Sequence, residues 1–314
     1  MQLRILTEPQ EGATYDDLLL VARESERLGF EGFFRSDHYQ HIGADDPGPG
    51  STDAWVTLAG LARETSVIRI GTLVSAVTFR RAGPLAVAVA TVDAMSGGRV
   101  ELGLGCGWFE DEHASYGMPF PSLEERFDLL EEHLAVVTGL WATPRGETFS
   151  FSGRHETLIE SPALPKPAQH PRPPIIIGGT GTDRTPCLAA RYADEYNVPP
   201  FEPVDVTVRQ FDIVRKACER VDRDPCSLVL SKAYPLMIGT REEDVRRRAA
   251  KIGMDASEAR SVGLCGLVSE VVDELGRLEE LGATRAYLDL MDLTDLEQIQ
   301  LVADEVVPQL AARA

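Results

Sequence analysis

The chain contains few cysteines and few histidines, and neither type is clustered. An odd number of cysteines without a Cys-x-x-Cys pair argues against a disulfide framework and against a cysteine zinc site. Of the six histidines, only His38 and His41 lie near one expected strand end, so a metal-dependent hydrolase is the weakest of the enzyme classes considered. We therefore expect no metal site. The cysteines are Cys106, Cys187, Cys218, Cys226 and Cys265.

Positive charge is also scarce in this sequence. Lysine and arginine total 31 against 50 acidic residues, giving a formal net charge of −19 over 314 residues. This balance opposes non-specific binding to nucleic acid and to anionic lipid. No apolar run reaches the roughly 18 residues of a membrane helix, and the first residues lack the apolar core of a signal peptide. We expect a cytoplasmic protein that acts on a small molecule and binds neither nucleic acid nor membranes.

Short strand-like runs alternate with longer amphipathic stretches along the whole chain. Eight such strand–helix units predict one (β/α)8 barrel domain over residues 1–314, with a doubly wound open sheet as the alternative. Segments near 108–121, 143–174 and 238–268 break the alternation, and we expect them to be insertions at the carboxyl-terminal face of the barrel. The expected strands cover residues 3–7, 32–36, 69–74, 100–104, 175–178, 195–198, 229–237 and 285–290.

Four of the expected strand ends carry unusual residues, and in a barrel such ends meet at one face. Ser36-Asp37-His38 places a histidine, which exchanges protons near neutral pH, directly after an apolar strand. The strand containing Leu73 turns polar at Ser75. Gly103 to Glu110 is rich in small residues that let a bulky ligand approach the backbone. Gly178 to Thr182 runs from a buried strand toward a helix start, where free N–H groups bind phosphate. Each glycine cluster taken alone is also compatible with a simple tight turn.

These motifs together resemble the luciferase-like monooxygenase superfamily, and within it the coenzyme F420-dependent oxidoreductases. The resemblance rests on Gly32-Phe33-Phe34-Arg35-Ser36-Asp37-His38, on Gly71-Thr72-Leu73-Val74, and on the turn Ser96-Gly97-Gly98-Arg99 before the strand Glu101-Leu102-Gly103-Leu104-Gly105. It continues through Ala163-Leu164-Pro165-Lys166-Pro167 to Gly179.

The resemblance implies particular roles for residues at the barrel mouth. His38 is implied to transfer the proton, with Asp37 beside the deazaflavin ring. Leu73-Val74 is implied to form a non-proline cis peptide that backs the ring. Trp108 and Glu110 are assigned to the substrate pocket. In the sugar-phosphate dehydrogenases of the family a glutamate takes the place of Trp108, so the tryptophan argues against a sugar-phosphate substrate. The further implied cofactor-binding residues are Gly105, Cys106, Gly107, Gly178, Gly179 and Thr180.

The function implied by the resemblance is hydride transfer between coenzyme F420 and a small organic substrate that the sequence does not identify. One alternative is an FMN-dependent monooxygenase that works with a separate flavin reductase. Another is a flavin-binding protein of this fold without turnover. The family also implies a homodimer, and the use of a diffusible cofactor implies a partner enzyme that reduces it.

Overall fold

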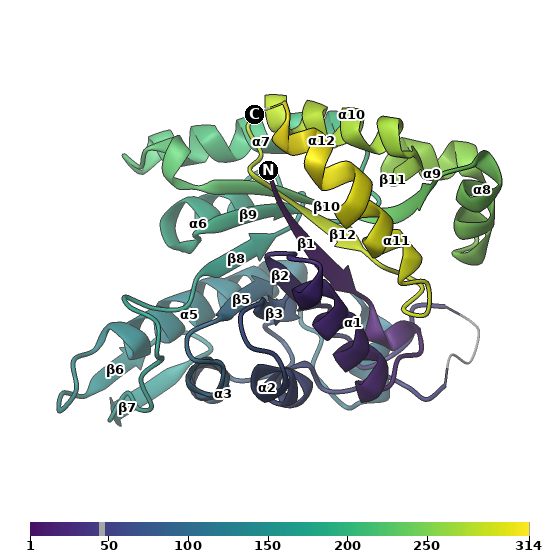
Figure 1. Cartoon of the computed structure of the whole chain (residues 1–314). Helices are drawn as coiled ribbons and strands as arrows, with labels where there is room; N and C mark the ends of the chain where they lie inside the picture. Colours follow the sequence, from purple (N-terminus) through teal and green to yellow (C-terminus); the bar gives the residue numbers. More distant parts are fainter. Residues whose placement is uncertain (44–47, 314) are drawn as a thin grey trace.

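Eight parallel strands close into a barrel in the computed structural model, which describes residues 1–43 and 48–313. The strand order is β1-β2-β3-β5-β8-β9-β10-β12, and parallel pairing of β12 with β1 closes the ring (Figure 1). The predicted (β/α)8 barrel is therefore confirmed, and the open-sheet alternative is excluded. The barrel strands are β1 (Gln2–Thr7), β2 (Gly32–Arg35), β3 (Arg69–Thr72), β5 (Val100–Gly105), β8 (Ile175–Gly178), β9 (Glu195–Val198), β10 (Val229–Gly239) and β12 (Arg285–Asp289).

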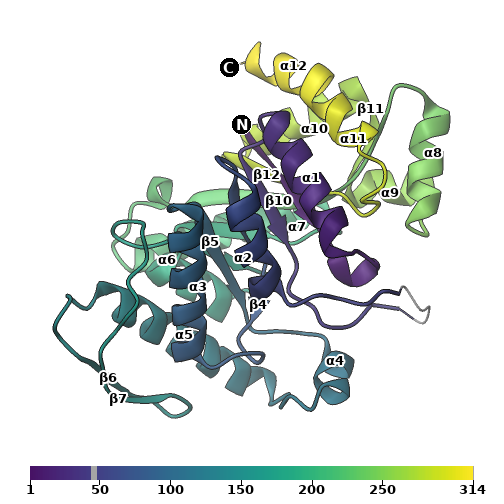
Figure 2. The ribbon, with the colours of Figure 1, turned by 60° about the horizontal axis from the view of Figure 1, so that its bottom comes forward.

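Helices follow the strands and pack around the outside of the barrel. Figure 2 shows α2 and α3 side by side, with α5 next to α3. The helices are α1 (Tyr15–Arg27), α2 (Ala54–Glu64), α3 (Ala82–Ser96), α4 (Glu110–Ser115), α5 (Leu123–Ala142), α6 (Arg184–Tyr192), α7 (Val204–Arg220), α8 (Glu242–Lys251), α9 (Ala256–Val262), α10 (Val268–Glu280), α11 (Glu297–Leu301) and α12 (Val307–Ala311). Shorter helical segments are η1 (Pro9–Glu11), η2 (Pro225–Ser227) and the π-helical η3 (Val302–Val306).

Alternate residues of each strand face the inside of the barrel, and these side chains fill it. On β1, Leu3 and Ile5 pack against the helices, whereas Arg4 and Leu6 face inward. Arg4 is fully buried and donates hydrogen bonds of 2.7 and 3.0 Å to the Glu101 carboxylate. Above this ion pair the rings of Phe34 and Tyr287 meet edge to face at 5.1 Å. The barrel is therefore a packed core, and a ligand site is confined to the carboxyl ends of its strands.

Of the three segments outside the strand–helix alternation, 143–174 and 238–268 lie on opposite sides of the barrel in both ribbon views. Residues 238–268 form α8, α9 and the strand β11 (Leu264–Leu267), which extends the carboxyl end of β10, as expected for an insertion at that face. Segment 108–121 includes α4. Segment 143–174 forms the hairpin β6 (Phe149–Ser152) and β7 (Thr157–Ser161).

The hairpin β6–β7 does not cover the carboxyl ends of the barrel strands. Glu132 of α5 accepts hydrogen bonds from the backbone N–H groups of residues 154–156 in its turn. Arg81, just before α3, donates to the carbonyl of His155. These contacts place the hairpin along the outer side of α3 and α5, with its turn at the level where α3 begins.

Strand β3 is shorter than the predicted range 69–74. It ends at Thr72, and the peptide bond between Leu73 and Val74 is cis, as expected. A two-residue strand, β4 (Ser75–Ala76), then pairs with β5 instead. The break turns the chain between two neighbouring strands, directly at the carboxyl end of the barrel.

Candidate active site

Asp37 follows β2 and is fixed by hydrogen bonds. Its carboxylate is 2% exposed and accepts hydrogen bonds of 2.6 Å from the Ser75 hydroxyl and 2.6 Å from the Arg80 guanidinium. Arg80 also binds Asp53 at 2.6 Å and the Tyr39 hydroxyl at 2.8 Å. Burial alone would lower the pKa of Arg80, but Asp37 and Asp53 raise it, so this guanidinium remains charged. Asp37 therefore joins the end of β2 to the segment after Val74, and both of its oxygens are engaged.

His38 is held by a carboxylate that the sequence did not point to. Its Nδ1 lies 2.9 Å from Oε1 of Glu112 in α4, and the other Glu112 oxygen accepts a 2.9 Å hydrogen bond from the Tyr39 N–H. Glu112 is 1% exposed. Burial lowers the pKa of His38, but the hydrogen bond and charge of Glu112 outweigh it, and the pKa is raised. Because Glu112 engages Nδ1, proton exchange with a ligand falls to Nε2.

Val74 brings the expected cofactor-binding segments together. Its methyl groups would lie 2.9 Å from a Cβ placed on Gly103 or Gly105, and 3.5 Å from one on Gly178. The residues of the cis peptide are therefore surrounded by glycine backbone from β5 and β8. Cys106, between two of the glycines, is half-buried, and burial raises the pKa of its thiol, with Arg126 acting in the opposite direction.

The loop after β8 turns its carbonyl groups into the protein. The Tyr196 hydroxyl donates to the Gly179 carbonyl at 2.7 Å, and the Gln210 amide donates to the Thr180 carbonyl at 2.7 Å. Among the described residues, the N–H groups of Thr180, Gly181 and Thr182 make no backbone hydrogen bond. A loop of this kind before a helix suits a phosphate group. Of the expected phosphate contacts, Gly178 lies next to Val74, the Gly179 N–H is taken by the Asn197 carbonyl, and the Thr180 N–H makes no backbone hydrogen bond.

Aromatic side chains stand beside His38. Trp108 is 61% exposed, stacks on Phe109 with ring centres 5.4 Å apart, and meets the His38 ring edge to face at 5.7 Å. Glu110, assigned to the substrate pocket together with Trp108, is an exposed residue at the start of α4. Their contacts with a substrate remain predictions.

Two further carboxyl groups lie at this end of the barrel and were not predicted from the sequence as site residues. Glu8 directly follows β1, and its carboxylate accepts a 2.5 Å hydrogen bond from the Gln10 amide. Asp289 is the last residue of β12 and is fully buried. The available signal was the same as for His38, a charged residue at the end of an apolar strand.

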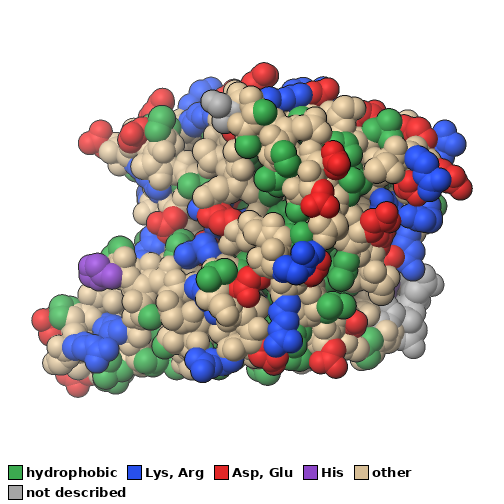
Figure 3. Space-filling model, viewed as in Figure 1, with side chains coloured by type: hydrophobic (Ala, Val, Ile, Leu, Met, Phe, Trp, Pro, Cys, Tyr) green, Lys and Arg blue, Asp and Glu red, His purple; other side chains and the backbone are tan. Residues whose placement is uncertain are grey.

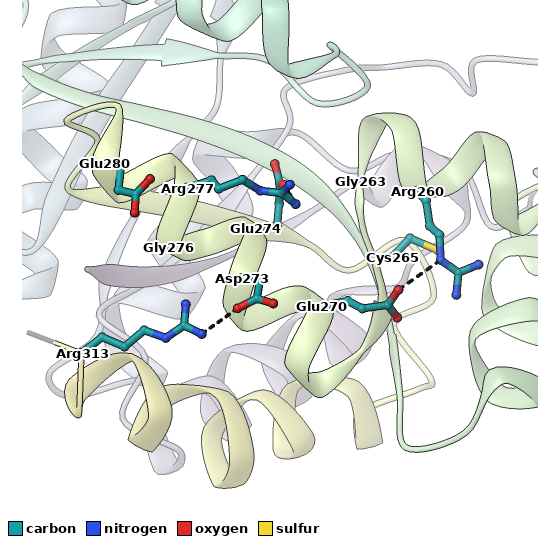
Figure 4. Close-up of a pocket in the computed structure, with 10 residues that line it drawn as sticks. All are labelled: Arg260, Gly263, Cys265, Glu270, Asp273, Glu274, Gly276, Arg277, Glu280 and Arg313. Atoms are coloured by element: carbon teal, nitrogen blue, oxygen red, sulfur yellow. Dashed lines mark hydrogen bonds and ion pairs between the residues drawn. The ribbon is translucent and has the colours of Figure 1, made fainter.

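Two cavities of the described structure lie away from these residues. One of about 460 Å³ lies between β11, α9, α10 and Arg313 (Figure 4). Its charged side chains pair with one another, as in the 2.6 Å contact of Arg313 with Asp273. A second, of about 340 Å³, is lined by residues of α8 and of the segment after β12, where Arg248 pairs with Asp295 at 2.7 Å. Neither is lined by Asp37, His38 or Val74. No group of metal-ligating side chains occurs within the described ranges.

Comparison with known proteins assigns the chain to a family. A profile of the luciferase-like monooxygenase family matches residues 1–310. The chain belongs to this family. The resemblance inferred from its motifs is thereby confirmed at the family level.

Relatives within the family include named F420-dependent enzymes. An F420-dependent hydroxymycolic acid dehydrogenase of Mycobacterium tuberculosis is 30% identical over 270 residues, covering 84% of this chain and 67% of that protein. An F420-dependent glucose-6-phosphate dehydrogenase of Microbacterium testaceum is 35% identical over 185 residues, covering 58% of this chain and 52% of that protein. The structure of an F420-dependent secondary alcohol dehydrogenase with an F420-acetone adduct superimposes with a TM-score of 0.84 at 20% identity, over 98% of each chain. This last similarity bears on the fold alone.

Proposed function

We propose that this protein is an F420-dependent oxidoreductase that transfers a hydride between the deazaflavin and a small organic substrate. The observation that carries the proposal is the position of His38, held at Nδ1 by Glu112 at the carboxyl end of the barrel where the Leu73–Val74 cis peptide lies. The names of the relatives with 30% and 35% identity support the cofactor assignment.

The residues around Val74 fit a flat cofactor with an anionic side chain. Any side chain at Gly103 or Gly105 would collide with Val74, so the backbone itself forms this part of the wall. The loop after β8 offers the N–H groups of Thr180, Gly181 and Thr182 for a phosphate. Leu73, Val74, Gly105, Cys106 and Gly107 would hold the ring and the start of the side chain.

His38 would hold and move the proton that accompanies hydride transfer. A bound deazaflavin supplies the hydride chemistry itself. Glu112 fixes the ring orientation of His38 and favours its protonated form, so Nε2 donates a proton to a substrate oxygen during reduction and takes one during oxidation. Asp37 positions the start of this loop through Ser75 and Arg80. Trp108 and Phe109 would exclude water on one side.

Parallel titrations with F420 and FMN test the cofactor assignment. The protein is incubated with each cofactor and desalted, and the absorbance of the retained fraction is measured. We expect retention of F420 and, with reduced F420, turnover of a substrate from a screen of alcohols, ketones and amines. Retention of FMN alone would favour the oxygen-dependent monooxygenase with a separate reductase. Retention of F420 without turnover over the whole screen would favour a binding protein.

We also propose that the protein forms a homodimer through α2 and α3. Over its 15 residues α3 exposes Pro84, Val87, Thr91 and Ala94, with no charged side chain on that face, and Val56 of the adjacent α2 is 72% exposed. A helix that is apolar on all sides is normally covered. Elsewhere, acidic and basic side chains are interspersed over the surface, as Figure 3 shows for one face. Light scattering should report a dimer, and Val87→Glu should give a monomer.

A separate enzyme would keep the cofactor reduced.

A further inference from the structure

Asp289 is a buried carboxyl group without a partner. It is the last residue of β12 and lies opposite Leu6 of β1 and Pro235 of β10 in the parallel ladders. Because Tyr287, two residues earlier, belongs to the inward-facing cluster, Asp289 also faces inward, one layer nearer the mouth. Its side chain is 0% exposed, and neither oxygen has a hydrogen-bond partner among the described residues.

The charges around Asp289 make this burial more costly. Burial raises the pKa of Asp289 well above its usual value, and the nearby carboxylates Glu8 and Glu11 raise it further. Burial likewise raises the pKa of Glu8, against opposing effects of Gln10 and His38. The basic groups on this side are already engaged: His38 lies against Glu112, His41 Nδ1 lies 2.8 Å from the Glu11 carboxylate, and Arg35, which interacts with Glu8, is bound by Thr52 and Thr57. An unpaired buried carboxyl group costs stability, so a group of this kind is retained where a ligand uses it.

Other buried charged groups of the barrel, unlike Asp289, have hydrogen-bond partners. Arg4 is paired with Glu101 one layer below, and Asp37 is paired with Arg80. No group of three or more ligating side chains suited to a metal ion occurs among residues 1–43 and 48–313. Asp289 lacks a hydrogen-bond donor. A positively charged donor would bind both carboxyl oxygens of Asp289 and would also balance the charge of Glu8.

We propose that the substrate carries an ammonium group, which Asp289 binds at the floor of the barrel mouth with Glu8 contributing charge. This inference rests on the proposed function, since it names the substrate class of the same site. A phosphate or carboxylate would not favour the ionised form of Asp289 and would face the carboxyl groups of Glu8 and Glu11. The ammonium group serves for recognition, and the carbon that exchanges the hydride lies elsewhere in the substrate.

The test compares three probes with one carbon ring: cyclohexylammonium, cyclohexanol and cyclohexanecarboxylate. Their binding to the full chain is measured by calorimetry, with and without saturating F420. A hydrogen bond to a charged group contributes roughly 1.5–3 kcal/mol, so we expect the ammonium probe to bind at least about tenfold more tightly than the other two. Because Asp289 releases its proton to the buffer when the cation binds beside it, repeating the titration in buffers of different ionisation enthalpy should show proton release.

Variants separate Asp289 from general charge effects. Asp289→Asn should reduce the ammonium preference about tenfold and abolish proton release, while raising the melting temperature because an unpaired buried carboxyl group is removed. Asp273→Asn is the matched control: Asp273 lies on α10 with its side chain 63% exposed, and the preference should not change. Should Asp289→Asn fail to fold, Glu8→Gln must lower the same preference.

The wild-type chain alone can overturn the proposal. Equal affinity for the ammonium and the alcohol would do so whatever the variants show, as would an unchanged preference in folded Asp289→Asn. F420 retention is measured independently of the probes. A chain that prefers the ammonium probe but does not retain F420 would contradict the proposed function and leave the assignment of Asp289 supported.

Discussion

Replacement of Glu112 by glutamine tests how His38 works. Glu112 accepts two hydrogen bonds of 2.9 Å, one from His38 Nδ1 and one from the Tyr39 N–H, and it is 1% exposed. Glutamine has nearly the same shape but no charge. Its NH2 group replaces one of the two acceptor oxygens, so one donor loses its partner and His38 loses the adjacent negative charge.

The size of the effect follows from the hydrogen bond that is weakened. A buried hydrogen bond to a charged group contributes roughly 1.5–3 kcal/mol, and about 1.4 kcal/mol corresponds to a factor of ten. We therefore expect kcat to fall about 10- to 100-fold near neutral pH. Since Glu112 raises the pKa of His38 against the effect of burial, the variant should also move the pH dependence of substrate reduction to lower pH.

The assay is the pH profile of kcat with reduced F420, together with the imidazole resonance of His38 followed by NMR. Glu124→Gln, at an exposed position in the first turn of α5, is the control and should behave as the wild type. A folded Glu112→Gln protein with an unchanged profile and an unchanged His38 resonance would show that Glu112 does not govern this proton.

The remaining predictions concern three other residues and the pH dependence of stability. His38→Ala should lower turnover roughly 10²–10⁴-fold with little change in F420 affinity, and equal turnover would assign the proton to another group. Gly103→Ala should destabilise the fold by about 1–3 kcal/mol in urea, because its Cβ would meet the Thr72 carbonyl and Val74. Arg80→Leu should cost about 3–5 kcal/mol by leaving Asp37 buried without a counter-ion, and Arg80→Lys less. The pKa of Asp289 is raised on folding, so its favourable contribution to stability is present below the unfolded pKa of 3.8 and declines as pH rises. The gain in melting temperature from Asp289→Asn should therefore grow from pH 4 upward. Glu8, Glu11 and His38 are the titratable groups near Asp289.

The barrel could be predicted because its signal is local and repeated. Each of the eight strand predictions overlaps an observed strand, with ends that differ by no more than two residues. Two strand ends differ by two residues: β10 continues to Gly239, and β3 stops at Thr72, after which the chain moves on to pair with β5. Segment 143–174 was recognised as an interruption, but its packing along α3 and α5 depends on contacts such as those of Glu132, which no local pattern reports.

The candidate site was only partly accessible from the sequence. Asp37, His38 and the Leu73–Val74 bond came from motifs that are continuous in the chain. Glu112 lies 74 positions from His38, and their contact depends on how α4 is placed after β5. The sequence analysis selected Glu110, two positions earlier, which lies on the exposed side of the same helix. A shift of two residues rotates a helical side chain by about 200°, so without the phase of α4 the two glutamates could not be distinguished.

Charge compensation distinguishes Asp289 from the buried carboxylates Glu101 and Asp37. Arg4 with Glu101, and Asp37 with Arg80, are buried pairs in which each charge has its partner within the fold. His38 with Glu112 is a pair with one ring nitrogen left for exchange. Asp289 is buried, and neither of its carboxyl oxygens has a hydrogen-bond partner among residues 1–43 and 48–313. Since folding alone would favour an apolar residue at that position, the partner that explains Asp289 must arrive with the substrate. The same reasoning explains a buried carboxyl group at the barrel mouth in a chain of net charge −19: Asp289 ionises when a cation binds beside it, so the site selects a cation.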